Sequence, residues 1–198
     1  MRKYLILLSI FAIVLSSCDG ERVFTPKPRM YPRVDYPTHA YEQFQSDVCN
    51  FTFLKPVYSE VDSDVDFFGE KKSDLCWFDL NIKQLNSTIH FSYNKIEGEN
   101  TLQKLVDDSF QLVEKHNVKA EYRAESPVDN QYGVQGFRFD IDGPVASPIN
   151  FFLTDTTQHF VRASLYFNDA VYPDSIAPVL DFVSQDVAKI LETFRWKE

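Results

Sequence analysis

FFLTDTTQHFVRASLYF, residues 151–167, is the stretch that decides the fold. Aromatic and β-branched residues run up to Thr154 and resume at Phe160, and Asp, Thr and Gln, which favour turns, stand between them. Because a linker of four or five residues cannot make a parallel crossover, the two runs must pair as an antiparallel hairpin. The sequence therefore predicts a sheet with antiparallel strands.

Other segments have the same strand character, which brings the expected sheet to about six strands. The predicted strands are Asn50–Val57, Leu75–Ile82, Ser87–Lys95, Gln131–Ile141, Ile149–Thr154 and Phe160–Phe167. The residues between the first two, Ser59–Asp74, are acidic and predict an exposed loop. Their alternating carboxylates lack the glycine and distal glutamate of an EF-hand, so a solvated charge run is the better interpretation.

Two segments have the periodicity of amphipathic helices. The first runs from Asn100 to about Asn117, with Asn100 and Gln103 spaced as a capping box. Its apolar stripe is Leu102, Leu105, Val106, Leu112 and Val113. The second starts near Asp174, and its apolar positions are Ile176, Leu180, Val183, Val187, Ile190, Leu191 and Phe194. The predicted class is α+β, a mainly antiparallel sheet packed with two helices.

The N-terminus predicts an exported, lipid-anchored chain. Arg2 and Lys3 precede an apolar run from Tyr4 to Leu15, which is shorter than the about 20 residues of a membrane span. Leu15-Ser16-Ser17-Cys18 resembles a bacterial lipobox, which implies a signal peptide at 1–17 and acylation of Cys18 by fatty acids such as palmitate. The alternative, an ordinary signal peptide with a chance cysteine, still exports the chain.

The charge of the exported chain limits its partners. Removing Arg2 and Lys3 leaves 18 of the 20 basic side chains against 29 acidic ones, a formal charge of −11. Such a surface repels phosphate backbones and anionic headgroups, so we expect no nucleic-acid partner. Membrane attachment then depends on the lipid.

A proline-rich stretch follows the lipidated cysteine. PKPRMYPRVDYP, residues 26–37, places four prolines where neither helix nor strand periodicity is present. We expect residues 18–45 to form an extended, semi-stiff tether and residues 46–198 a single globular domain.

The two remaining cysteines, Cys49 and Cys76, are an even pair in a compartment that permits oxidation. A disulfide between them would contribute roughly 3 to 4 kcal/mol by the chain-entropy argument. The alternative is two buried thiols that pack as small hydrophobes. A zinc site is poorly supported because no histidine lies near either cysteine.

No catalytic motif, cofactor fingerprint or metal-ligand spacing is present, so we expect no cofactor, no metal site and no enzyme. Asp155, His159 and Arg162 are the best candidates for chemistry, because the turn of the hairpin places them close in sequence. Their residue types are also those of an ordinary turn. An envelope enzyme or small-ligand-binding lipoprotein using this region is the alternative function.

The strand that begins at His159 has two different faces. Val161, Ala163 and Leu165 share one face, and Phe160, Arg162, Ser164 and Tyr166 share the other. If helices cover only one face, then Phe160, Arg162 and Tyr166 form a docking surface. If both faces are covered, Arg162 must be paired inside and the docking surface lies elsewhere. Aromatic residues make up 15% of the chain, which suggests that some rings remain at the surface.

Together these segments resemble a known family. The lipobox, PKPRMYPRVDYP, the CNF and CWFDL segments, GPVASPINFFLTDTTQHFVRASLYF and the closing ILETFRWK are similar to the gliding motility lipoprotein GldD of Bacteroidota. The portion from HFVRASLYF onwards also resembles the α/β/α sandwich of the Mog1/PsbP type.

The resemblance implies a component required for gliding and for type IX secretion. With the lipobox, it leads us to expect a chain that is anchored in the cell envelope and faces the periplasm, with the inner membrane favoured and the outer membrane left open. It also implies partners, namely the CorC-like integral membrane protein GldE and other gliding and secretion components, and it supplies no catalytic residues that could be carried over to this chain. We hypothesise that the tether docks on its own domain or on a membrane partner. The residues concerned are Arg29, Tyr31, Arg33, Asp35 and Tyr36. The alternative is a proline-rich stalk with incidental cations.

Overall fold

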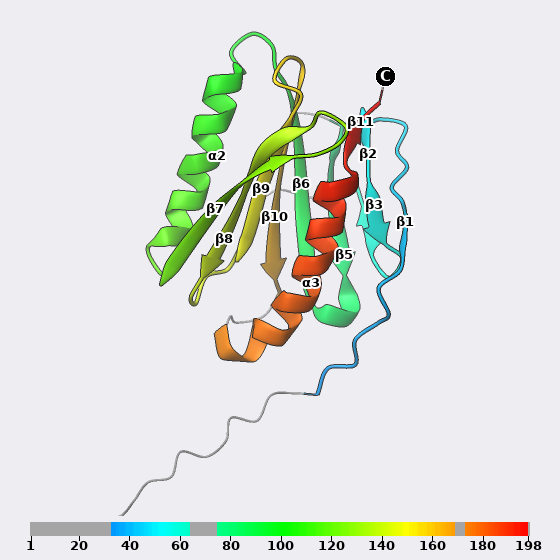
Figure 1. Cartoon of the computed structure of the whole chain (residues 1–198), viewed down its shortest axis with the longest axis vertical. Helices are drawn as coiled ribbons and strands as arrows, with labels where there is room; N and C mark the ends of the chain where they lie inside the picture. The colour runs from blue at the N-terminus through cyan, green and yellow to red at the C-terminus, as the bar shows by residue number, and fades with distance from the viewer. Residues whose placement is uncertain (1–32, 64–74, 169–172, 198) are drawn as a thin grey trace, which may run out of the picture. The chain divides into compact units, whose positions relative to one another are not determined.

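The hairpin of residues 149–167 lies near the middle of a seven-stranded sheet (Figure 1). Strands β9 (Ile149–Thr154) and β10 (His159–Phe167) pair antiparallel, with Ala163 opposite Phe151. This computed structural model describes residues 33–63, 75–168 and 173–197. The sequence prediction of an antiparallel hairpin is confirmed.

The sheet continues on both sides of the hairpin, and every neighbouring pair is antiparallel. Its order is β4-β5-β6-β10-β9-β8-β7. The other five strands are β4 (Glu60–Asp62), β5 (Trp77–Ile82), β6 (Ser87–Lys95), β7 (Tyr122–Asp129) and β8 (Gln135–Asp142), and a 3₁₀ turn, η1 (Lys83–Leu85), joins β5 to β6. Strand β7 was not predicted. Strand β4 occupies the start of the predicted acidic loop. The loop prediction was therefore wrong for Glu60–Asp62, because these residues pair with β5.

One helix packs on each face of the sheet (Figure 1). Helix α3 (Pro173–Thr193) contributes Val183, Val187 and Ile190 to the larger core cluster, which the odd-numbered residues of β10 enter from the sheet. Helix α2 (Leu102–Asn117) packs Leu105 and Val113 on the opposite face. The α+β class is therefore confirmed, with a helix on both faces.

Helix α2 departs from its prediction in two details. Its N-cap is Thr101, whose hydroxyl accepts a hydrogen bond from the backbone N–H of Lys104, so the expected Asn100–Gln103 capping box was wrong. Gln103 instead donates to Asp107 one turn later. Leu112, expected in the apolar stripe, remains 37% exposed.

The aromatic residues mostly fill the core. Phe78 and Phe91 lie 4.7 Å apart between ring centroids, and Phe53 packs 5.4 Å from Phe91. The fully buried phenylalanines of the described residues are Phe44, Phe51, Phe53, Phe78, Phe91, Phe139, Phe151, Phe160 and Phe194. The rings that stay largely exposed are tyrosines, namely Tyr36, Tyr122 and Tyr132. The composition suggested that some aromatic rings remain at the surface. Among the large exposed side chains of the described residues, the aromatic ones are these three tyrosines.

The end of the predicted tether belongs to the folded unit. Strand β1 (Tyr41–Gln43) pairs with β3 (Leu54–Pro56), and β2 (Phe51–Thr52) pairs with β11 (Arg195–Trp196). Phe44 is only 2% exposed, so the boundary expected between residues 45 and 46 lies inside the fold. Residues 33–43 are called the strap below. The signal peptide, Cys18, Arg29 and Tyr31 lie outside the described residues.

A disulfide ties the N-terminal part of the fold to the sheet. Cys49 and Cys76 are joined with their Cα atoms 5.1 Å apart, and both side chains are buried. Cys49 precedes β2 and Cys76 precedes β5, so the bond links the small β2–β11 sheet to the main one.

Candidate functional site

The strap lies against helix α3 through aromatic contacts. The His39 ring stacks on Phe182 at 4.0 Å between centroids, and the Tyr36 ring lies 4.9 Å from the same phenylalanine. The side-chain amide of Gln84 donates a hydrogen bond of 2.8 Å to the backbone carbonyl of Asp35. Val34 packs against the main core. The strap therefore has a defined path on the folded unit.

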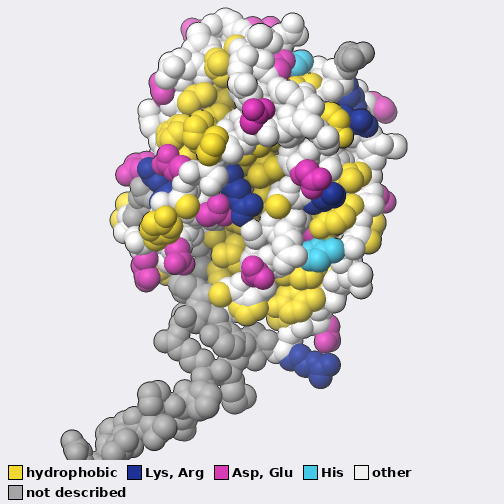
Figure 2. Space-filling view, viewed as in Figure 1, with side chains coloured by type: hydrophobic (Ala, Val, Ile, Leu, Met, Phe, Trp, Pro, Cys, Tyr) yellow, Lys and Arg dark blue, Asp and Glu magenta, His cyan; other side chains and the backbone are white. Residues whose placement is uncertain are grey.

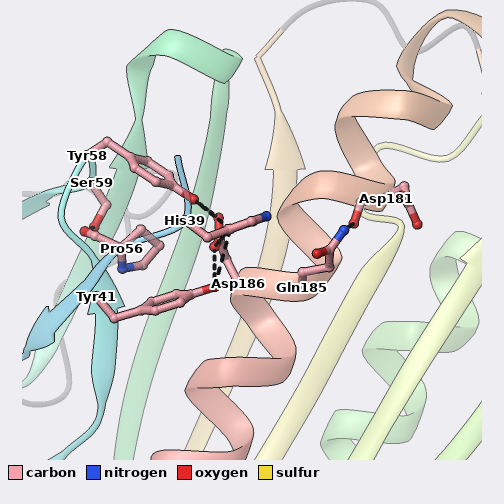
Figure 3. Close-up of polar contacts among 8 residues, drawn as sticks. All are labelled: His39, Tyr41, Pro56, Tyr58, Ser59, Asp181, Gln185 and Asp186. Atoms are coloured by element: carbon pink, nitrogen blue, oxygen red, sulfur yellow. Dashed lines mark hydrogen bonds and ion pairs between the residues drawn. The ribbon is translucent and has the colours of Figure 1, made fainter. Parts of the chain in front are cut away.

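A buried carboxylate fastens the strap. Asp186 of α3 is fully buried, and its Oδ1 accepts hydrogen bonds from His39 Nδ1 at 2.9 Å and from the Tyr41 hydroxyl at 3.0 Å. Its Oδ2 accepts a hydrogen bond of 2.6 Å from the hydroxyl of Tyr58, which follows β3 (Figure 3). We call these four residues, His39, Tyr41, Tyr58 and Asp186, the latch. It joins the strap, the segment after β3 and α3.

The position of Asp186 in the sequence explains its burial. It stands three residues after Val183 and four before Ile190, within the apolar stripe of α3. A carboxylate buried in this way needs hydrogen-bond donors, which the two tyrosines and the histidine supply. The sequence prediction missed all four latch residues. An acidic residue on the apolar face of a helix was the signal that could have indicated Asp186.

The environment of the latch keeps its two phenols protonated. Burial, and then the charge and hydrogen bond of Asp186, raise the pKa of Tyr41 to about 12. Burial, and then the hydrogen bond to Asp186, raise the pKa of Tyr58 even further above its ordinary value. Both groups therefore act as neutral hydrogen-bond donors to the carboxyl group of Asp186. This chemistry fastens one segment to another.

The raised phenol pKa values predict a loss of stability in alkali. Below pH 10 the phenols are protonated in both the folded and the unfolded state, so their contribution to the free energy of unfolding is complete. Above pH 10 the phenols of the unfolded chain ionise first. The contribution therefore falls as the pH rises towards about 12. We expect the urea midpoint to fall more steeply between about pH 10 and pH 12 for the unmodified chain than for a Tyr41→Phe, Tyr58→Phe double variant. Parallel declines of the two midpoints would contradict the assignment.

The structure places Asp155 beside His159 but does not bring Arg162 to them. Oδ1 of Asp155 accepts hydrogen bonds from three backbone N–H groups of the turn, which lower the pKa of this carboxyl although burial opposes them. His159 Nδ1 lies 2.6 Å from the Tyr93 hydroxyl, on the α3 side of the sheet. Arg162 points to the other face because side chains alternate along β10. The predicted cluster was wrong, since Asp155 stabilises a turn.

Helix α2 covers only part of the docking surface predicted on β10. Phe160 is 1% exposed within the core under α2. Arg162 and Tyr166 line a cavity beside α2. On the strap, Arg33 and Asp35 form an exposed ion pair of 3.4 Å, and Tyr36 is 41% exposed. These three strap residues are thus accessible at the surface.

Two further properties concern only the described residues. Within the ranges 33–63, 75–168 and 173–197, we find no group of three or more His, Cys, Asp or Glu side chains placed to hold a metal ion. None of the helices in these ranges is both long and apolar enough to cross a membrane.

Comparison with known proteins identifies the family. The family model for the gliding motility lipoprotein GldD matches residues 21–196. The chain belongs to the GldD family. GldD family membership makes it a gliding motility lipoprotein, held at a membrane of the cell envelope.

Matches outside the GldD family are remote. None of the curated proteins compared with the chain matches it. Among solved structures, the solution structure of cyanobacterial PsbP (CyanoP) from Synechocystis sp. PCC 6803 is similar over 87% of this chain and 99% of that one, with 12% identity and a TM-score of 0.43.

Proposed function

We propose that this GldD-family chain is a non-enzymatic component of the gliding machinery, also required for type IX secretion, that works through protein contacts at the membrane. The observation that supports this proposal is the latch. A spacer would need only length and flexibility, whereas this segment is held on the folded unit by a buried carboxylate and three donors. We propose that the anchor is the acylated Cys18 in a leaflet that faces the periplasm, with the inner membrane favoured.

The latch also limits how far the folded unit can lie from the lipid. Arg33 follows Cys18 by fifteen residues, which span at most about 50 Å when fully extended. Because the strap is fastened from residue 34 onwards, this short connection sets the reach of the domain. A partner would therefore lie in or close to the same membrane. An integral membrane protein such as the CorC-like GldE fits that requirement.

The outward side of the strap is the proposed contact surface. Arg33 and Asp35 are exposed there, and Tyr36 stacks on Phe182 while keeping 41% of its surface accessible. Arginine and tyrosine are frequent interface anchors, and a backbone already held in place loses little entropy on binding. Figure 2 shows hydrophobic side chains gathered near the lower end of the face that carries α3, close to charged groups.

Affinity purification of the full-length chain from cross-linked membranes would test this surface. We expect an Arg33→Ala, Tyr36→Ala variant to recover about fivefold less GldE than the unmodified chain, because it removes two anchors and leaves the latch intact. The triple variant Arg29→Ala, Tyr31→Ala, Arg33→Ala should show the same loss.

The control is Tyr122→Ala, which removes a tyrosine from the edge strand β7 that is even more exposed than Tyr36, at 66% against 41%. It should leave GldE recovery unchanged. Each of these variants must still fractionate with membranes. A Cys18→Ser chain, by contrast, should appear in the soluble fraction. Equal recovery by the strap variants and the control would exclude the strap as the contact surface.

A further inference from the structure

A cavity of about 280 Å³ opens on the α2 face of the sheet, away from the latch. Its floor is formed by side chains of β6 and β10 that lie in neighbouring register, with Ser92 opposite Arg162 and His90 opposite Ser164. Trp77 of β5, Leu112 and His116 of α2, and Asn150 and Tyr166 complete the lining. Helix α2 buries the phenylalanines of β8 to β10 and leaves this side of the face open.

The charge of Arg162 is the unusual feature of this cavity. Burial lowers the pKa of its guanidinium, and Asp108 of α2 opposes that effect only through charge attraction. Among the described residues, no carboxylate forms an ion pair with Arg162. Buried arginines are normally paired with hydrogen-bonded acceptors, because an isolated buried charge is costly. The sequence led us to expect that a covered Arg162 is paired inside the fold. No carboxylate of the described residues makes that pair.

The groups around Arg162 are mostly neutral. Burial lowers the pKa of His116, which favours its uncharged form, and burial raises the pKa of Tyr166, which keeps its hydroxyl protonated. His90 Nδ1 lies 2.5 Å from Asp79 Oδ1, so that carboxylate already has a partner. The cavity thus offers one fixed positive charge, several hydroxyl and ring groups, and aromatic walls.

We propose that this cavity binds a small organic monocarboxylate, with its carboxylate on Arg162 and its apolar part against Trp77, Tyr166 and Leu112. A planar guanidinium matches the two oxygens of a carboxylate. Among the described lining residues Arg162 is the single cation and no lysine is present, which suits one negative charge better than the two of a phosphate. The volume is at the lower end of ligand sites, which limits the guest to a small molecule. This site is separate from the strap contact surface.

Tryptophan fluorescence offers a local test. The chain has two tryptophans, so Trp196→Phe leaves Trp77 in the cavity wall as the only one. In this background, we would titrate the mature lipidated chain in detergent with 3-phenylpropionate, with its neutral amide, and with inorganic phosphate. We expect saturable change with the carboxylate, at least tenfold weaker binding of the amide, and weaker binding of phosphate. Equal binding of carboxylate and amide, tighter binding of phosphate, or no saturable signal would overturn the proposal.

Substitution of Arg162 then tests whether its guanidinium binds the carboxylate of the ligand. Arg162→Gln should weaken 3-phenylpropionate binding at least tenfold. Arg138→Gln is the matched control, because Arg138 is also largely buried but pairs with Asp140 on the α3 face. It should bind as the parent does, and an equal loss in the control would overturn the assignment. If Arg162→Gln does not fold, the carboxylate and amide comparison on the parent chain still decides the question.

Discussion

Asp186→Ala is expected to lower the free energy of unfolding by about 3 kcal/mol, because it removes the one acceptor shared by three donors. The hydroxyls of Tyr41 and Tyr58 would lose their carboxylate partner in a region where water has little access. The loss is at the low end of the range for broken buried ion pairs, since His39 keeps 27% of its side-chain surface exposed. Urea unfolding of the mature chain, followed by circular dichroism, measures it.

The matched control for this substitution is Asp181→Ala, which removes an exposed carboxylate from the same helix. We expect that control to change stability by less than about 0.5 kcal/mol. Asp186→Asn keeps an acceptor but removes the charge, so its effect should lie between the two. If Asp181→Ala and Asp186→Ala were equally destabilising, the latch would not hold the strap.

The same variants separate the latch from ordinary core packing. Release of the strap should leave Arg33 and Tyr36 on an unfastened backbone, where limited proteolysis cuts before the domain unfolds. A general loss of stability would instead make cleavage follow global unfolding. Early cleavage in Asp186→Ala but not in Val183→Ala is the pattern that a fastened strap predicts.

The hairpin and both helices could be predicted because each has a strong period. Residues 160–167 alternate, and α3 carries a long stripe that packs on the sheet. Strand β7 could not be found in the same way. It is an edge strand with mostly exposed residues, so Arg123 and Glu125 replace the apolar alternation that burial would require. Its Pro127 also argued against a strand, although an edge tolerates proline.

The latch could not be predicted from the sequence, for a different reason. Prolines in residues 26–37 indicate an extended backbone, but they say nothing about the surface on which that backbone lies. Tyr41 and Asp186 are separated by 145 residues, and no local pattern records such a contact. For Arg162, the alternation assigned the correct face of β10, but it could not show that α2 covers only part of that face. The periodicity of apolar residues therefore predicts which face of a strand or helix a side chain lies on. Tertiary packing decides which of these side chains remain accessible.

Replacing Cys49 and Cys76 together by alanine is expected to lower the free energy of unfolding by about 3 kcal/mol. The bond joins positions 27 residues apart, so its loss restores substantial freedom to the unfolded chain. Both side chains are also buried, at 3% and 1% exposure, so the smaller alanines remove packing atoms beside the phenylalanine-rich core. Urea unfolding of the oxidised parent and the double variant under identical conditions gives the difference.

A reducing agent provides the internal control. Dithiothreitol should lower the urea midpoint of the parent towards that of the double-alanine variant, whose own midpoint should not respond because it has no bond between these positions to reduce. The reduced parent should stay somewhat more stable than the variant, since its two thiols still fill the space that alanine leaves empty. An unchanged parent midpoint, with the thiols shown to be free by alkylation, would mean that packing and not the cross-link stabilises this part of the fold.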